Sequence, residues 1–140
     1  MKPVTAKLIL AASILAGSLA AAGSALAHHS NSMYEPVTTV TLKGSVKAFQ
    51  WTNPHAVIWV IVQPEGGGEP QEWGVETTSP GVLTRNGWAH NSIKAGDRVS
   101  VEFKPLRDGS HGGFLKSITL LDTGQKLSAS IIPAEAAGQK

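Results

Sequence analysis

From Thr39 to Leu121 the chain alternates apolar and polar residues with a period of two, in short runs that end at glycine, proline, asparagine or aspartate. Successive side chains of a β-strand point to opposite faces, so this period is typical of half-buried strands and not of helices. We expect strands at 39–48, 55–62, 71–77, 98–103 and 114–121, with a short extension at 125–127. The run 55–62 is apolar on both faces and is expected in the middle of the sheet.

The segments between these strands carry turn and helix signals. The apolar phase reverses near Ala48, which predicts a β-bulge, and Asn53-Pro54 marks a turn. Ser79 can cap a helix whose first residue is proline, and Asn86-Gly87 ends it after one or two turns. Together the elements predict an all-β fold, a small, partly closed, five- to six-stranded Greek-key barrel of the OB type with one short helix. An open β-sandwich is the alternative.

The first 27 residues have the three parts of a secretory signal peptide. Lys2 and Lys7 give the positive start, residues 8–16 are apolar, and Ala25-Leu26-Ala27 is a small-x-small cleavage sequence. Serines and glycines interrupt the stretch, so it is a poor membrane span. Cleavage would remove 27 of the 140 residues and leave 113, which suits one domain at 28–128 with a flexible tail at 129–140. We therefore expect an exported protein with no membrane span after cleavage.

The charge and the cysteine content of the chain exclude several classes of function. Lys2 and Lys7 leave with the signal peptide, so 10 Lys and Arg remain against 10 Asp and Glu. A neutral domain without a basic run lacks the charge that binds phosphates, and we expect no nucleic-acid partner. The chain has no cysteine, which excludes disulfides, thiolate metal sites and a cysteine nucleophile.

All five histidines follow the predicted cleavage point and are the residues best suited to bind a metal. His28 would become N-terminal, where its α-amine and ring Nδ1 can close a chelate on a metal ion. A further imidazole would complete a T-shaped nitrogen site of the histidine-brace kind, which suits Cu(II). We expect this imidazole from His55, because the Asn-Pro turn before it fixes its position. Further candidate ligands are His111, His29, His90 and Met33. The alternative is that a His-His terminus is only a solvated chain end.

Four tryptophans offer a second kind of site. Most strand tryptophans pack in the core. Trp51 and Trp88 lie beside predicted loops and are the best candidates for exposed rings, and with Asn53 they form the candidate ligand-binding set. The alternative to copper binding is therefore a metal-free, OB-like binding module that holds a protein or glycan partner.

Several short motifs follow one another along the chain after residue 26. They are Ala27-His28-His29-Ser30, Gly44-x-Val46, Trp51-Thr52-Asn53-Pro54-His55, Ser79-Pro80 with Leu83, Arg85, Gly87 and Trp88, then Gly96-Asp97 and Arg107-Asp108-Gly109. In combination they resemble an exported bacterial family of unknown function. The resemblance extends over nearly all of the chain after the signal peptide. It implies a periplasmic location and no particular activity, and the loop at 65–69 looks lengthened by comparison.

The function expected from these observations is a periplasmic, non-enzymatic protein that binds or handles copper through an N-terminal histidine site. We expect no catalytic residues. A brace-type oxidase is the enzymatic alternative, although polysaccharide oxidases of that kind are usually larger than this domain. A periplasmic protein is a candidate partner, and the expected state is a monomer or a weak oligomer.

Overall fold

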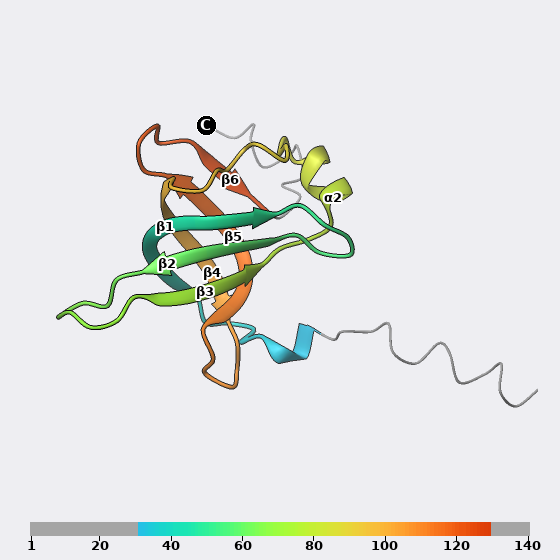
Figure 1. Ribbon diagram of the computed structural model, residues 1–140. Helices are drawn as coiled ribbons and strands as arrows, with labels where there is room; N and C mark the ends of the chain where they lie inside the picture. Colours follow the sequence, from blue (N-terminus) through green and yellow to red (C-terminus); the bar gives the residue numbers. More distant parts are fainter. Residues whose placement is uncertain (1–30, 130–140) are drawn as a thin grey trace, which may run out of the picture. The chain divides into compact units, whose positions relative to one another are not determined.

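The structure is a computed structural model that describes residues 31–129, and within this range six strands and two short helices form (Figure 1). Their bounds are η1 Asn31–Met33, β1 Val40–Gln50, β2 Val57–Val62, β3 Gln71–Glu76, α2 Pro80–Arg85, β4 Arg98–Pro105, β5 Gly112–Leu120 and β6 Lys126–Ser128. Each expected strand is present, with ends that differ by at most two residues from those predicted. The predicted signal peptide, His28, His29 and residues 130–140 of the predicted tail lie outside the described residues. The first residue of that tail, Ala129, is buried in the core at 6% exposure and belongs to the barrel.

The strands close into a barrel. The sheet order is β3-β2-β1-β4-β5-β6, with antiparallel neighbours, and a parallel pairing of β3 with β5 joins the two sides. The 11-residue strand β1 pairs with β2 along one half and with β4 along the other, and its register shifts between Val46 and Ala48. This shift confirms the predicted bulge, which bends β1 so that it can serve both sides of the barrel. The closed barrel with a helix between β3 and β4 confirms the OB-like fold and excludes the open sandwich.

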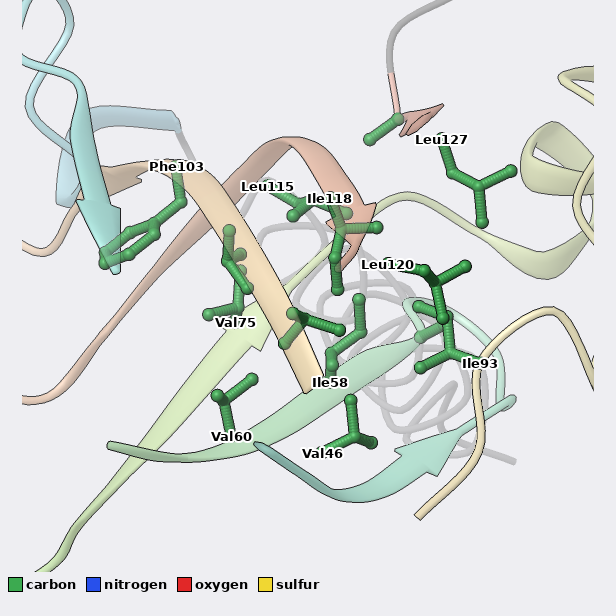
Figure 2. Close-up of a cluster of buried hydrophobic side chains, with 14 of the residues drawn as sticks. Val46, Ile58, Val60, Val75, Ile93, Phe103, Leu115, Ile118, Leu120 and Leu127 are labelled. Carbon is green, nitrogen blue, oxygen red and sulfur yellow. The ribbon is translucent and has the colours of Figure 1, made fainter. Parts of the chain in front are cut away.

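The core is made of the inward-facing side chains of all these strands. Figure 2 shows side chains such as Val46, Ile58, Val75 and Phe103 pointing toward one another inside the barrel. Strand β2 runs in the middle of the sheet as expected, yet it is buried on one face only, since every second residue remains partly exposed. The outer residues of β2 therefore belong to the surface of the barrel.

The short helix α2 forms where the capping signal predicted it. The Ser79 side chain accepts a hydrogen bond from the Val82 backbone N–H at 3.4 Å, and Gly87 takes a positive φ of 84° just after the helix. Leu83 of this helix is fully buried in the core. Within residues 31–129, no helix is long and apolar enough to span a membrane.

The expectation of an exposed ring at Trp88 is wrong. Trp88 follows α2 closely and is only 2% exposed, and its indole Nε1 donates to the Ser128 carbonyl at 2.8 Å. The turn after α2 brings this ring into the core beside Phe49 instead of into a loop surface. Trp88 is thus a structural residue that joins the end of the helix to β6.

Candidate functional site

The β1–β2 turn holds His55 in a defined position. The next residue, Ala56, exchanges backbone hydrogen bonds with the two residues after β3: its N–H donates to the Thr78 carbonyl at 3.1 Å, and its carbonyl accepts from the Thr77 N–H at 2.9 Å. The Asn53-Pro54 bond before it is cis. The His55 side chain itself is 41% exposed on the outer surface. The scaffold therefore fixes the backbone of this histidine and leaves its ring accessible.

The ring of His55 is paired with a carboxylate on the neighbouring strand. His55 Nδ1 makes a short hydrogen bond to Oε1 of Glu76, the last residue of β3. A carboxylate accepts hydrogen bonds, so the shared proton belongs on Nδ1 when the ring is neutral. In that tautomer the other ring nitrogen, Nε2, carries the free lone pair.

Tyr34 holds the second oxygen of the same carboxylate. The Tyr34 hydroxyl donates to Glu76 Oε2 at 2.6 Å, and Tyr34 as a whole is only 7% exposed. Its ring packs against Phe114 with the centroids 5.5 Å apart, and its carbonyl accepts from Arg107 Nε at 3.1 Å. We call these three side chains the His55–Glu76–Tyr34 chain.

The surroundings of Tyr34 keep its hydroxyl protonated. Burial, followed by the hydrogen bond and negative charge of Glu76, raises the pKa of Tyr34 well above its ordinary value. The phenol is therefore a permanent donor at neutral pH. Because it is locked by its own packing, it fixes the carboxylate, and the carboxylate in turn orients the imidazole.

The other histidines of the described region have surroundings that differ from those of His55. His111 precedes β5, and its ring stacks on Trp73 with the centroids 4.6 Å apart and an angle of 18° between the planes. His90 is exposed between α2 and β4. Within residues 31–129, no group of three or more His, Asp or Glu side chains gathers as a ready-made metal site. The described barrel thus presents His55 with its carboxylate partner as its best-oriented imidazole.

The remaining candidate residues are Trp51 and Asn53, which lie between β1 and β2, and Met33, which ends η1. Trp51 is partly buried and packs edge-on against Phe49, with the ring centroids 5.4 Å apart. Asn53 is exposed in the turn, and the Met33 side chain is 46% exposed. Of the proposed ligand-binding set, Trp51 and Asn53 are accessible, whereas Trp88 is not.

The sequence analysis missed Glu76 and Tyr34 as partners of His55. A signal for Glu76 existed, because the alternation places His55 and Glu76 on the outer faces of two strands joined by one hairpin. Tyr34 gave no such signal. An isolated β-bridge from Tyr34 to Leu106 holds the backbone of Tyr34 where its hydroxyl can bond Glu76. The two bridged residues are 72 positions apart, and no local pattern reveals such a pairing.

Comparison with known proteins gives a family and a structural likeness. No curated protein matches the chain. A crystal structure of the mitochondrial single-stranded DNA binding protein Rim1 from S. cerevisiae resembles it with a TM-score of 0.47 and 15% sequence identity, covering 60% of this chain and 93% of that chain. The family model named DUF6152, a family of unknown function, matches residues 16–116. This match includes more than half of the sequence, and the chain therefore belongs to the DUF6152 family.

Proposed function

We propose that this protein binds copper in the periplasm, with His55 Nε2 as one ligand and the amine and ring of an N-terminal His28 as the others. The observation that carries the proposal is the His55–Glu76–Tyr34 chain. A histidine that binds a metal almost always donates its other ring N–H to a carboxylate, a carbonyl or water. His55 has this arrangement, with Nε2 as the nitrogen left for the metal.

The second oxygen of Glu76 adds to this argument. A carboxylate that only neutralised a surface histidine would need no further partner. Here the buried Tyr34 hydroxyl fixes it, so the carboxylate has one orientation and the imidazole can turn little about its Cβ–Cγ bond. An ordered carboxylate of this kind raises the basicity of the ligand and reduces the entropy lost when the metal binds.

The N-terminal ligands depend on cleavage of the predicted signal peptide after Ala27. His28 then contributes two nitrogens from one residue. His28 lies six positions before Tyr34 in the sequence, and a segment of that length spans at most about 22 Å. This short segment connects the proposed amine ligand to the residue that fixes Glu76, and His29 and His111 remain assisting ligands in the proposal.

Copper is the proposed metal because the donors are an amine and imidazoles. Cu(II) favours tetragonal nitrogen coordination and has the highest affinity of the common divalent ions for such donors. The amine has an ordinary pKa near 8, so its deprotonation by copper costs little at neutral pH. The Met33 thioether, exposed just before Tyr34, is a soft donor that would suit Cu(I). Nothing in this donor set calls for turnover, and we propose a non-enzymatic role in binding or transferring the ion.

The substitution Glu76→Gln tests whether the carboxylate supports a metal ligand. It removes the charge that orients His55, and we expect the Cu(II) affinity of the cleaved protein to fall about 10- to 100-fold. Competition titration against a chelator of known affinity measures the change.

The matched control is Glu72→Gln, which removes a carboxylate from the same outer face of β3 but from an ion pair with Lys47. This control should bind Cu(II) as tightly as the unchanged protein. Equal affinities for all three proteins would contradict the role proposed for Glu76, and a loss in both variants would show a general charge effect instead.

A further inference from the structure

The outer face of β2 carries a tryptophan flanked by small residues. Trp59 lies opposite Ala48 on β1 and opposite Gly74 on β3. Neither neighbour has a side chain large enough to stand up beside an indole ring. Ala48 and Gly74 therefore leave a low floor on either side of Trp59, and we call this outer surface of β1, β2 and β3 the Trp59 face.

Two contacts show that the indole lies flat on this floor. On one side, a Cβ placed on Gly74 would come within 2.9 Å of Trp59 Cζ3 and 3.2 Å of Cη2, so the six-membered ring lies directly over the glycine. On the other side, Trp59 Nε1 donates to the Gln50 side-chain oxygen at 3.0 Å, in an exposed hydrogen bond on β1. The ring thus extends from β1 to β3 across β2, with one face on the sheet.

The groups around Trp59 are polar, and each has a hydrogen-bonding or ionic partner. Lys47 and Glu72 form an ion pair at 2.5 Å, and Glu76 is shared between His55 and Tyr34. Next to Trp59 along β2, Ile61 lines a shallow groove of about 530 Å³ that also involves Lys43 and Leu121. The face therefore offers a flat apolar surface with hydrogen-bonding groups and charges of both signs at its edges.

We propose that this Trp59 face is a binding site for a neutral sugar, with one pyranose ring stacked on the indole and its hydroxyl groups hydrogen-bonded by Gln50, Glu72 and Lys47. An aromatic surface with a few polar groups at its edge matches the mixed apolar and polar faces of a sugar ring. A polyanion such as single-stranded nucleic acid is disfavoured, because the carboxylates of Glu72 and Glu76 lie on the same face without surplus cations. The groove beyond Ile61 gives room for a second ring.

The test follows the tryptophan indole N–H signals by NMR while a sugar is added to the chelator-treated, copper-free protein. The probes are maltotetraose, cellotetraose and chitotetraose, with an oligothymidylate as the polyanion. We expect at least one sugar to shift the Trp59 signal, with a dissociation constant of about 1 mM, as a single stacked ring gives only modest affinity. Because copper is absent, the outcome is independent of the copper site.

Three variants make the test specific. Trp59→Ala should abolish the binding, and Val37→Ala, which truncates an exposed apolar side chain outside β1, β2 and β3, should leave it unchanged. Gly74→Ala keeps Trp59 but forces its ring off the floor, so the affinity should fall at least about tenfold, on the order of one stacking contact. The proposal is overturned if none of the sugars shifts the Trp59 signal, if Trp59→Ala still binds as well, or if only the oligothymidylate binds there.

Discussion

Three alanines added before His28 are expected to lower the Cu(II) affinity of the cleaved protein at least about 100-fold, which corresponds to about 2.7 kcal/mol. The extension moves the amine away from the His28 ring and so destroys the chelate that the two nitrogens form together. Every side chain, including His55 and its partner Glu76, stays in place. Copper competition titration at neutral pH measures the difference.

The length of the extension matters to this comparison. A single added alanine would make His29 the third residue, where the amine, two peptide nitrogens and its ring can form a new copper chelate. Three alanines avoid that arrangement. Intact-mass measurement of the unchanged protein must show that it starts at His28, and each protein should keep the same thermal unfolding midpoint without copper. Equal copper affinity of the two proteins would contradict a chelate at the N-terminus.

Replacing Phe103 with alanine is expected to destabilise the barrel by about 3–5 kcal/mol. Phe103 is fully buried, and its ring packs on Trp73 with the centroids 5.7 Å apart. A Cβ on Gly113 would come within 2.3 Å of Phe103 Cδ2, so the ring also rests directly on the backbone of β5. That backbone is held on both sides, by β4 and by the parallel pairing with β3, and it cannot collapse into the space left by the ring.

Urea unfolding followed by tryptophan fluorescence measures this loss. Val37→Ala is the control, because Val37 is 88% exposed and its truncation should change the stability by less than about 0.5 kcal/mol. A loss of less than about 1 kcal/mol in Phe103→Ala would mean that the centre of the core has been assigned wrongly.

Most of the fold could be predicted from the sequence because its signals are local. Alternation located most strands and an apolar run located β2, while the phase change near Ala48 located the bulge. Ser79 with Pro80 located the start of α2. The burial of Trp88 was not predicted, because a position in a loop of the sequence does not reveal that the indole N–H donates to a carbonyl of β6. The half-exposed outer face of β2 was missed for a related reason, since an apolar run does not reveal whether a second layer covers it.

The candidate site was only partly predictable. The Asn-Pro turn identified His55 as a histidine in a fixed position, and in the structure the next residue, Ala56, is hydrogen-bonded through its backbone to Thr77 and Thr78. The residues that orient its ring come from β3 and from the segment before β1, and barrel closure alone brings them together. Likewise, no pattern in the sequence shows that Gly74 gives space to Trp59, because this contact depends on strand register.

The central claim is that His55 is a copper ligand oriented by Glu76, and pulsed EPR of the Cu(II) complex tests it most directly. The spectrum of the protein that starts at His28 reports how many imidazole rings bind the ion, and it is compared with the spectrum of His55→Ala. The account predicts one fewer bound imidazole in the variant, together with weaker Cu(II) binding. The same number of bound imidazoles and the same affinity in both proteins would contradict it.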